Sequence, residues 1–398
     1  MKRALVLAFT ALLVPAPARA ASLATTQRVL ARAMAHAGAY SGAYVVDVGT
    51  GEQIYASNAD IARMPASVEK LYTSATALLH YGAAGRLTTT VLAPALPDAD
   101  GDIAGDLILR GGGDPTFDSQ DAAALATRLV RGGLRRVDGR VVGDESEFDA
   151  FRGPPSSRFL LSSDVGPLSA LAYDHGRTGR RHPYFQTSPA RFAAQAFQKL
   201  LRRRGVKIAG RARAGIAPDG TTPLSHWDSP AIAEIVREMN QPSDNYIAET
   251  LVKALGADFG AAGSTAAGAQ VVEDTVARFK IAPQVQDGSG LSRADRTTPR
   301  QIVRLLTGMA SSAQAEAFDA SLAVVGRNGT LAKRMRGTSA QDRCQAKTGT
   351  LRDVSTLAGY CTTVSGRRIA FAFLMNAIAA WRAHPLQNRM TIALARLD

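Results

Sequence analysis

Three short motifs combine serine hydroxyls with lysines that can activate them. Residues 67–70 read Ser-Val-Glu-Lys, residues 243–245 read Ser-Asp-Asn, and residues 347–349 read Lys-Thr-Gly. Positions i and i+3 of a helix share one face, so the amine of Lys70 can reach the hydroxyl of Ser67. A serine hydroxyl becomes a good nucleophile when a neighbouring base removes its proton. The first motif therefore predicts a nucleophile, Ser67, and its base, Lys70.

Lysine at these positions is informative because the chain strongly prefers arginine. Of its 47 basic residues only eight are lysines, and Lys70 and Lys347 are two of the eight. Arginine does not lose its proton at physiological pH, so it could not replace Lys70 as a base. Burial together with a nearby cation, Lys347, would lower the pKa of Lys70 toward neutrality. Three such motifs in this order are poorly explained by chance.

Particular elements must bring these motifs together. A helix is predicted from residue 66 to 81, with Pro65 at its start. The N-terminus of this helix leaves the N–H of Ser67 free and favours developing negative charge. Pro242 marks a junction between two helices at the second motif. The third motif lies on the first of three successive strands near the C-terminus.

The distribution of strand and helix patterns predicts the fold class. Strand patterns lie at both ends of the chain, and helical periodicity dominates residues 229–325. We therefore expect an α/β (α+β) fold, with an antiparallel sheet built from both termini and flanked by helices. The catalytic domain is expected in two parts, residues 21–89 and 226–398. Residues 90–225 would form an inserted, mostly β region between them.

The two cysteines, Cys344 and Cys361, flank a turn centred near residues 352–353. In a regular hairpin they lie directly opposite each other, as do Lys347 and Ala358, so we expect a cross-strand disulfide. Side chains alternate along a strand, which puts Cys344 on the opposite face from Lys347. The expected role of the disulfide is to stiffen the strand that carries the third motif.

The first twenty residues have the pattern of a cleaved signal peptide. A basic start, Met1-Lys2-Arg3, precedes an apolar run that is too short to span a bilayer, and Ala18-Arg19-Ala20 fits the small-x-small cleavage rule. Residues 1–20 are therefore predicted to direct export to the periplasm or another extracytoplasmic space. We expect at most loose membrane association, because no later segment is long and apolar enough to span a bilayer.

Composition and charge limit the kinds of partner that the protein could bind. Hydrophobic residues make up 46% of the chain and charged residues 20%, as in ordinary globular proteins. The net charge of +13 comes from residues scattered along the sequence, apart from Arg202-Arg203-Arg204. Without an aromatic–basic platform this surplus does not indicate nucleic acid, and attraction to an anionic envelope polymer explains it equally well. Neither metal-binding histidine spacing nor a nucleotide motif occurs, so no metal or cofactor is expected.

The motifs and their order resemble the serine penicillin-binding proteins and class A β-lactamases. The resemblance to one group, the class C low-molecular-mass enzymes of peptidase family S13, extends over the mature chain nearly end to end. It implies a fold of the β-lactamase/transpeptidase type. It also implies a D-alanyl-D-alanine carboxypeptidase that acts as a DD-endopeptidase as well, with peptidoglycan stem peptides as substrates and β-lactams as inhibitors. The stretches that carry it are residues 64–67 (MPAS), 111–116 (GGGDPT), 287–293 (DGSGLSR), 329–331 (GTL) and 347–351 (KTGTL).

The resemblance implies five catalytic residues, Ser67, Lys70, Ser243, Asn245 and Lys347, the last of which also binds substrate. Ser67 would be the acylated nucleophile and Lys70 its general base. Ser243 would relay the proton to the amine of the leaving D-alanine, and Asn245 would hold the penultimate amide of the substrate. These roles need a hydroxyl, an amine and a carboxamide within hydrogen-bond reach of one another.

Other residues are implied in substrate binding. Lys347, Thr348 and Thr350 would bind the terminal carboxylate through charge-assisted contacts. Gly349 would let the substrate backbone lie against the strand edge, and the N–H of Thr350 would be the second oxyanion donor. Contacts to the side chain of the diamino-acid residue of the stem peptide are implied for Arg293 and Asp144.

Two other functions compete with the DD-peptidase. A β-lactamase would share Ser67, Lys70, Asn245 and Lys347, but it also needs a base-activated water, and no Glu-xxx-Asn loop can be placed between the second and third motifs. A non-catalytic cell-wall-binding protein could use the same fold. Such a protein would not need a deprotonatable lysine three residues after a serine, so the DD-peptidase is favoured.

Overall fold

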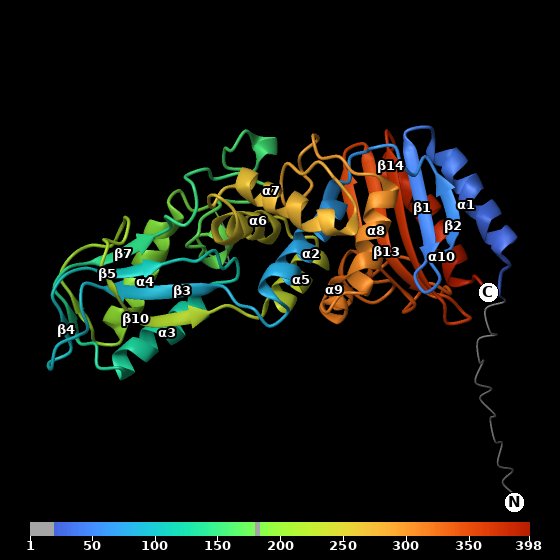
Figure 1. Ribbon diagram of the computed structural model, residues 1–398. Helices are drawn as coiled ribbons and strands as arrows, with labels where there is room; N and C mark the ends of the chain where they lie inside the picture. The colour runs from blue at the N-terminus through green and yellow to red at the C-terminus, as the bar shows by residue number, and fades with distance from the viewer. Residues whose placement is uncertain (1–19, 180–183) are drawn as a thin grey trace, which may run out of the picture.

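Two bodies follow one another along an elongated molecule (Figure 1). The computed structural model describes residues 20–179 and 184–398. The predicted signal peptide therefore lies outside the described residues, except for Ala20. The body that holds both ends of the described chain also holds all three motifs, and the second body is formed from the middle of the chain.

A six-stranded sheet in the order β11-β12-β13-β14-β1-β2 forms the centre of the first body. All neighbouring strands are antiparallel, and β14 pairs with β1, so the two ends of the chain share one sheet. The predicted fold class is thus confirmed. The strands are β1 (Ser41–Asp47), β2 (Gln53–Ser57), β11 (Ala323–Val324), β12 (Cys344–Leu351), β13 (Val354–Thr362) and β14 (Arg368–Asn376).

Helices cover both faces of this sheet. On one face, α1 (Leu23–Ala37) and α10 (Ala380–Ala395) bury an apolar layer against the strands. A larger apolar core fills the space between the opposite face and the remaining helices of this body. Those helices are η1 (Ala66–Glu69), α2 (Lys70–Tyr81), α5 (Ile232–Asn240), α6 (Asn245–Phe259), α7 (Thr265–Val276), η4 (Ala277–Phe279), α8 (Pro299–Ala310) and α9 (Ala315–Ser321).

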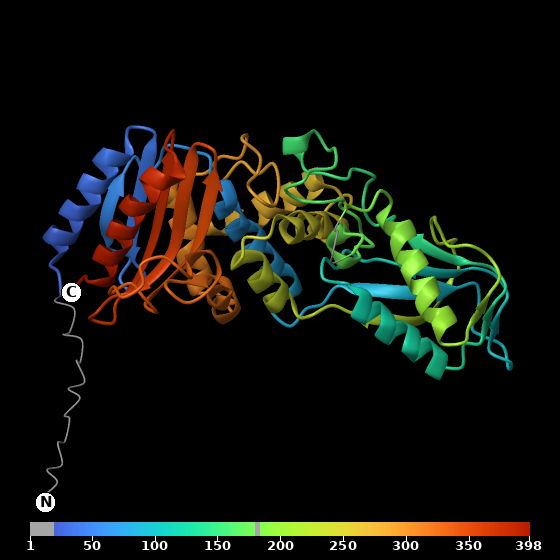
Figure 2. The ribbon, with the colours of Figure 1, turned by 180° about the vertical axis from the view of Figure 1, so that it is seen from behind.

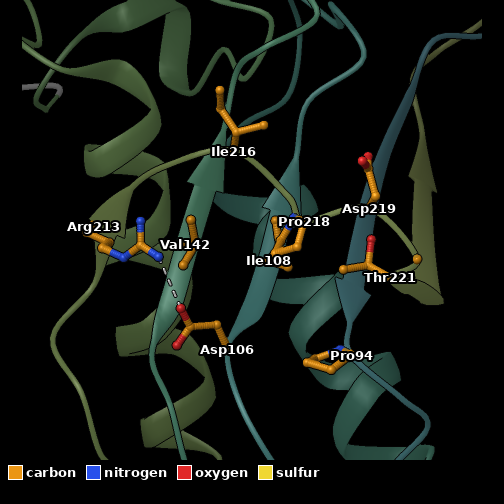
Figure 3. Close-up of a pocket in the computed structure, with 10 residues that line it drawn as sticks. Pro94, Asp106, Ile108, Val142, Arg213, Ile216, Pro218, Asp219 and Thr221 are labelled. Atoms are coloured by element: carbon orange, nitrogen blue, oxygen red, sulfur yellow. Dashed lines mark hydrogen bonds and ion pairs between the residues drawn. The ribbon is translucent and has the colours of Figure 1, made fainter.

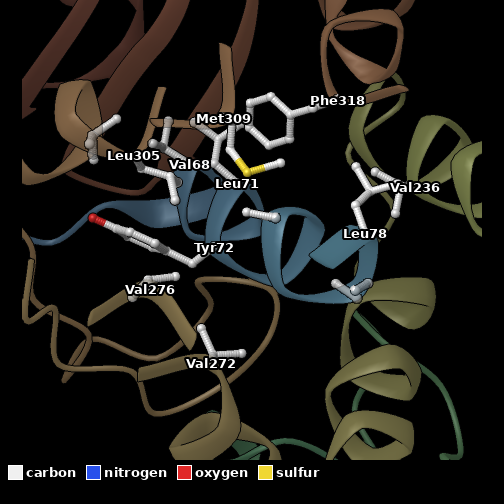
Figure 4. Close-up of a cluster of buried hydrophobic side chains, with 14 of the residues drawn as sticks. Val68, Leu71, Tyr72, Leu78, Val236, Val272, Val276, Leu305, Met309 and Phe318 are labelled. Atoms are coloured by element: carbon white, nitrogen blue, oxygen red, sulfur yellow. The ribbon is translucent and has the colours of Figure 1, made fainter. Parts of the chain in front are cut away.

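Helix α2, which follows the nucleophile motif, is the most enclosed of these elements. Its residues Leu71, Tyr72 and Leu78 are fully buried, and side chains from α5, α7, α8 and α9 surround them (Figure 4). The helix predicted over 66–81 is confirmed, with its first turn wound as the 3-10 helix η1. Because protein interiors are close-packed, this burial fixes the position of the first motif.

The hairpin of β12 and β13 has the expected register. Cys344 opposes Cys361 and the two form a disulfide with their Cα atoms 4.0 Å apart. Lys347 opposes Ala358. Both cysteines belong to the apolar layer beneath α10. The predicted disulfide is confirmed, and the side chain of Lys347 points to the other face of the sheet.

The second body contains a five-stranded sheet, β10-β3-β5-β7-β9, and a three-stranded sheet, β4-β6-β8. One face of the larger sheet packs against α3 (Ser119–Arg131) and α4 (Pro189–Arg203), which lie at the two helical stretches of this region. The strands are β3 (Thr88–Ala93), β4 (Asp102–Ile103), β5 (Leu107–Arg110), β6 (Arg136–Val137), β7 (Val141–Asp144), β8 (Lys207–Ile208), β9 (Arg213–Ala214) and β10 (Thr222–Asp228).

The opposite face of the five-stranded sheet carries only a small apolar cluster, formed by Leu92, Ile108 and Val142. A cavity of about 300 Å³ opens over it, with the ion pair of Asp106 and Arg213 (3.2 Å) at its edge (Figure 3). Across the described residues of both bodies, no helix has the length and apolarity needed to cross a membrane.

Candidate active site

Ser67 lies in the η1 turn, half-buried between the buried residues Ala66 and Val68. Ala66 has a left-handed backbone (φ 48°), a strained conformation that persists only where the surroundings hold it. The loop of residues 287–293 provides such a constraint. A Cβ on Gly290 would lie 2.0 Å from the carbonyl oxygen of Ala66, so only glycine permits this close packing. The nucleophile therefore stands on a tightly supported turn.

Lys70 connects this turn to two other parts of the chain. Its Nζ donates hydrogen bonds to Ser67 Oγ (3.1 Å), Asn245 Oδ1 (2.7 Å) and the carbonyl oxygen of Ser289 (2.7 Å). Together these bonds use all three donors of an ammonium group. When the amine loses a proton, its two remaining N–H groups keep the shorter bonds to Asn245 and Ser289, and its lone pair points toward Ser67. This geometry suits an amine that accepts the hydroxyl proton of Ser67.

Burial sets the proton affinity of this amine. Lys70 is fully buried, and desolvation lowers its pKa to about 8, although the nearby carboxyl groups of Asp287 and Glu249 act in the opposite direction. A general base works best when its pKa lies near the pH at which the enzyme operates. The pKa of Lys70 therefore matches the role that its geometry allows.

Lys347 places a second buried amine beside the first. Its Nζ donates to Ser243 Oγ (2.8 Å) and to the carbonyl oxygen of Thr348 (2.8 Å), while Thr348 Oγ1 donates to Thr330 Oγ1 (2.8 Å). Burial, reinforced by the charge of Lys70, lowers the pKa of Lys347 well below its usual value. An arriving carboxylate would raise this pKa again, because an opposite charge favours the protonated amine.

Gly349 brings the third motif against the nucleophile. A Cβ at this position would lie 2.8 Å from the carbonyl oxygen of Pro65 and 2.9 Å from the backbone nitrogen of Ser67. It would also lie 2.2 Å from Thr356 Oγ1, which itself donates to Pro65. The strand β12 therefore runs directly beside η1. Thr350, the next residue along β12, is exposed, so this contact lies at the protein surface.

Comparison with known proteins identifies the family to which this site belongs. Residues 25–180 and 181–397 match the D-Ala-D-Ala carboxypeptidase 3 (S13) family. The chain belongs to this family. It is a serine-type D-Ala-D-Ala carboxypeptidase, which confirms the family and the activity expected from the motifs.

Relatives resemble the chain over most of its length. A D-alanyl-D-alanine carboxypeptidase from Actinomadura sp. is 28% identical over 433 residues, which cover 88% of this chain and 80% of the relative. Carboxypeptidase DacB from Mycolicibacterium smegmatis is 30% identical over 363 residues, covering 83% and 75%. Penicillin binding protein 4 from Haemophilus influenzae shares the fold, with a TM-score of 0.78 at 20% identity, covering 91% of this chain and 97% of that structure.

Buried carboxyl groups behind Lys70 are a part of this S13 site that sequence reasoning missed. Glu249 Oε1 accepts a hydrogen bond from the N–H of Ser289 (3.0 Å), and Asp287 Oδ1 accepts one from Gly290 (2.7 Å). These two acids hold the loop whose Ser289 carbonyl binds Lys70. The spacing of Glu249, four residues after Asn245 on one helix face, is the signal that could have revealed it.

Two further carboxyl groups, Glu69 and Asp295, are also buried here. Burial is the main cause that raises the pKa of Glu249 to about 8 and that of Asp295 to about 11, so Asp295 keeps its proton at neutral pH. The protonated Asp295 limits the negative charge that surrounds Lys70. Within residues 20–179 and 184–398, no three His, Cys, Asp or Glu side chains are grouped so that they could hold a metal ion.

The last two predicted substrate residues do not join the S13 catalytic cluster. Arg293 is exposed at the end of the 287–293 loop, where it forms an ion pair with Asp353 (2.8 Å) of the β12–β13 turn. Asp144 is fully buried at the end of β7 in the second body. Its two oxygens accept hydrogen bonds from the N–H groups of Ser146 and Ala217, both at 2.9 Å. Its carboxylate therefore holds its own sheet and is not presented to a substrate.

Proposed function

We propose that Ser67 attacks the carbonyl of the D-Ala-D-Ala bond while Lys70 acts as general base. Lys70 takes the hydroxyl proton as the bond between Ser67 Oγ and the carbonyl carbon forms, and the N–H groups of Ser67 and Thr350 stabilise the oxyanion. When the C–N bond breaks, Ser243 passes a proton to the leaving D-alanine amine. Water then hydrolyses the ester. The hydrogen bonds from Lys70 to Ser67 and Asn245 carry this proposal.

Substrate recognition would centre on Lys347. Its buried amine gains a proton when the terminal carboxylate of the stem peptide arrives, which makes the contact charge-assisted. Thr348 and Thr350 would contribute hydroxyl groups to the same carboxylate. The carboxamide of Asn245, whose Nδ2 now donates to the carbonyl oxygen of Asp164 (3.1 Å), would turn to the penultimate amide of the substrate.

The same acyl-enzyme would form from crosslinked stem peptides and from β-lactams. A peptidoglycan endopeptidase from Bdellovibrio bacteriovorus has a similar fold, with a TM-score of 0.56 at 19% identity, covering 85% of this chain and 86% of that structure. The Haemophilus influenzae penicillin binding protein 4 has also been solved in complex with a β-lactam. These neighbours support endopeptidase action and penicillin binding as further activities of the Ser67 centre.

The site of action would be the periplasm, where peptidoglycan is accessible. The predicted signal peptide at residues 1–20 supports export. The disulfide between Cys344 and Cys361 supports an oxidising compartment, because such bonds are rare in reducing cytosol.

A fluorescent penicillin tests the assignment of the nucleophile. Incubation of the mature protein, followed by peptide mass mapping, should place a stable label on Ser67, and the Ser67→Ala variant should carry none. The labelled enzyme should also fail to release D-alanine from a pentapeptide. Rapid loss of the label with hydrolysis of the drug would instead identify a β-lactamase. Absence of both labelling and D-alanine release would leave a wall-binding protein without catalysis.

A further inference from the structure

One side of the elongated molecule is formed by two helical layers. In the first body, α1 and α10 cover one face of the six-stranded sheet, and in the second body α3 and α4 cover one face of the five-stranded sheet. Figure 2 shows α10 in front of the first sheet and α3 and α4 in front of the second, with α1 at the edge beside β2, whereas in Figure 1 α10 and α4 lie behind their sheets. The four helices therefore share one side, which extends over both bodies.

The outward faces of these helices carry a large excess of positive charge. Helices α1, α4 and α10 contain no Asp or Glu, and the one acid of α3, Asp121, accepts a hydrogen bond from the N–H of Asp118 at the helix start. The exposed cations are Arg28 and Arg32 of α1, Arg128 and Arg131 of α3, Arg191, Lys199, Arg202 and Arg203 of α4, and Arg382 and Arg389 of α10.

These cations are exposed, although Arg128 and Arg202 each donate a hydrogen bond to a backbone carbonyl oxygen. Among the described residues, none of the ten forms an ion pair. Three acids of the second body are already matched, since Asp102 and Asp138 pair with Arg136, and Asp106 pairs with Arg213. The excess charge on this side is therefore not neutralised by ion pairs among the described residues.

The sequence did not reveal this surface, because the cations of each helix are separated along the chain by residues that face the sheet. On α4, Arg191, Lys199 and Arg203 recur at intervals that keep them on one helix face, while Phe197 and Leu201 turn toward the sheet. Helices α3 and α4 are also joined, because Arg204 Nε donates to Thr127 Oγ1 (2.9 Å). Residues that are scattered along the chain are thus gathered by folding into one basic surface.

An aromatic side chain accompanies the cations. Trp381, near the start of α10, is 76% exposed, and the guanidinium of Arg382 lies 6.0 Å from its ring centroid. Exposed tryptophan beside arginine is typical of membrane–water interfaces, where the ring sits at the level of the lipid headgroups. Neither α3 nor α4 contains an exposed large hydrophobic residue, so their contribution would be electrostatic.

We propose that this basic helical side binds the surface of an anionic phospholipid bilayer. The cations are spread over two bodies rather than lined up in one groove, which matches a plane of phosphodiester headgroups better than a single polymer chain. Each cation near such a surface strengthens binding about fivefold. The orientation suits catalysis, because α2 packs against the opposite face of the sheet from α10, leaving Ser67 turned away from the membrane.

Vesicle cosedimentation of the mature protein tests the proposal. Vesicles of phosphatidylcholine with phosphatidylglycerol should bind the protein at low salt, and vesicles of phosphatidylcholine alone should not. Binding should weaken as salt rises, since salt screens exposed charges. The K199E/R202E/R203E variant should bind at least on the order of a hundredfold more weakly, because each change removes a positive charge and adds a negative one. R28E/R32E/R389E should weaken binding comparably, because both layers contact the bilayer. W381A should also weaken binding although it changes no charge, because the exposed ring would contact the lipid headgroups.

A matched control carries the same change in charge on the opposite side. Arg278, Lys280 and Arg304 are exposed on η4, the residue after it and α8, and they form no ion pair within the described chain. R278E/K280E/R304E should therefore bind vesicles nearly as well as the parent. Equal loss in this control, or no loss in either basic-side variant, would overturn the proposal, as would failure of the parent to bind anionic vesicles.

Two parallel measurements distinguish the bilayer from the wall polymer as the ligand of this basic side. Each variant should still take the penicillin label on Ser67, which shows that it is folded and tests the proposed function independently of vesicle binding. Purified peptidoglycan sacculi should be sedimented with the same proteins. If the basic-side variants no longer bound sacculi but still bound anionic vesicles, the surface would belong to the wall polymer and the bilayer proposal would be wrong.

Discussion

Lys70 Nζ and Asn245 Oδ1 are 2.7 Å apart although their residues are separated by 175 positions in the sequence. This contact ties the helix of the first motif to the helix of the second and orients the amine before a substrate arrives. Preorganisation of this kind removes much of the entropic cost of aligning the reacting groups. The proton-accepting role of Lys70 can therefore be tested by substitution of this one residue.

Replacing Lys70 by arginine keeps a positive charge but removes a group that can lose its proton. Acylation by fluorescent penicillin should slow by about 10²–10⁴-fold in Lys70→Arg, the usual contribution of a general base. Lys253→Arg is a matched control, because Lys253 is also buried but forms an ion pair with Asp149 (2.6 Å). Acylation of Lys70→Arg at the parent's rate would exclude Lys70 as the base.

The pH dependence of acylation follows from the buried amine. Below its pKa of about 8, Lys70 holds the proton that it must lose in order to act as a base, so the rate should rise with pH and level off above that value. In Glu249→Gln the carboxamide can still accept the N–H of Ser289, but it no longer raises the pKa of Lys70. The inflection should therefore move to lower pH, while Glu238→Gln on the exposed face of α5 should leave it in place. An unchanged or higher inflection in Glu249→Gln would show that Glu249 does not set the pKa of the base.

Gly349 should tolerate no side chain. The Cβ of Gly349→Ala would meet Thr356 Oγ1 at 2.2 Å and the nitrogen of Ser67 at 2.9 Å, so β12 must move away from η1. A displacement of about 1 Å near reacting groups lowers the rate about a hundredfold. Acylation kinetics measure the effect, with Gly179→Ala as control because a Cβ there meets nothing within 4 Å. Equal rates in both variants would show that the close contact has no catalytic importance.

Local patterns made much of this molecule predictable. Lys70 reaches Ser67 because three residues make nearly one helical turn, and Cys344 meets Cys361 because hairpin register follows from counting along two strands. The bond from Lys70 to the Ser289 carbonyl spans 219 positions and depends on how Glu249 and the 287–293 loop pack, which no local pattern encodes.

The burial of individual side chains was the property that the sequence predicted least well. A substrate contact was expected for Asp144, yet the folding of β7 against its neighbours encloses it completely. The basic side has the same origin, because Arg28, Arg131 and Lys199 become neighbours of other cations only when four helices are placed on two sheets. Such surfaces depend on tertiary packing, to which the spacing of residues in one helix gives only a partial guide.

The disulfide between Cys344 and Cys361 should stabilise the hairpin without taking part in the chemistry. Its sequence separation is 17, and closing a loop of this length stabilises a fold by about 3 kcal/mol. Reduction, or the C344S/C361S variant, should therefore lower the thermal unfolding midpoint. Acylation of Ser67 at moderate temperature should persist, because both cysteines face α10 while Lys347 points to the other face of the sheet.

Circular dichroism with and without reductant measures this shift, and the C344S/C361S variant is its own control because reductant should not affect it. Titration with Ellman's reagent should detect no thiol in the unfolded, unreduced protein and two after reduction. Two reactive thiols before reduction would show that the bond does not form. A loss of acylation equal to the loss of stability would mean instead that the hairpin needs the disulfide to keep Lys347 and Gly349 beside Ser67.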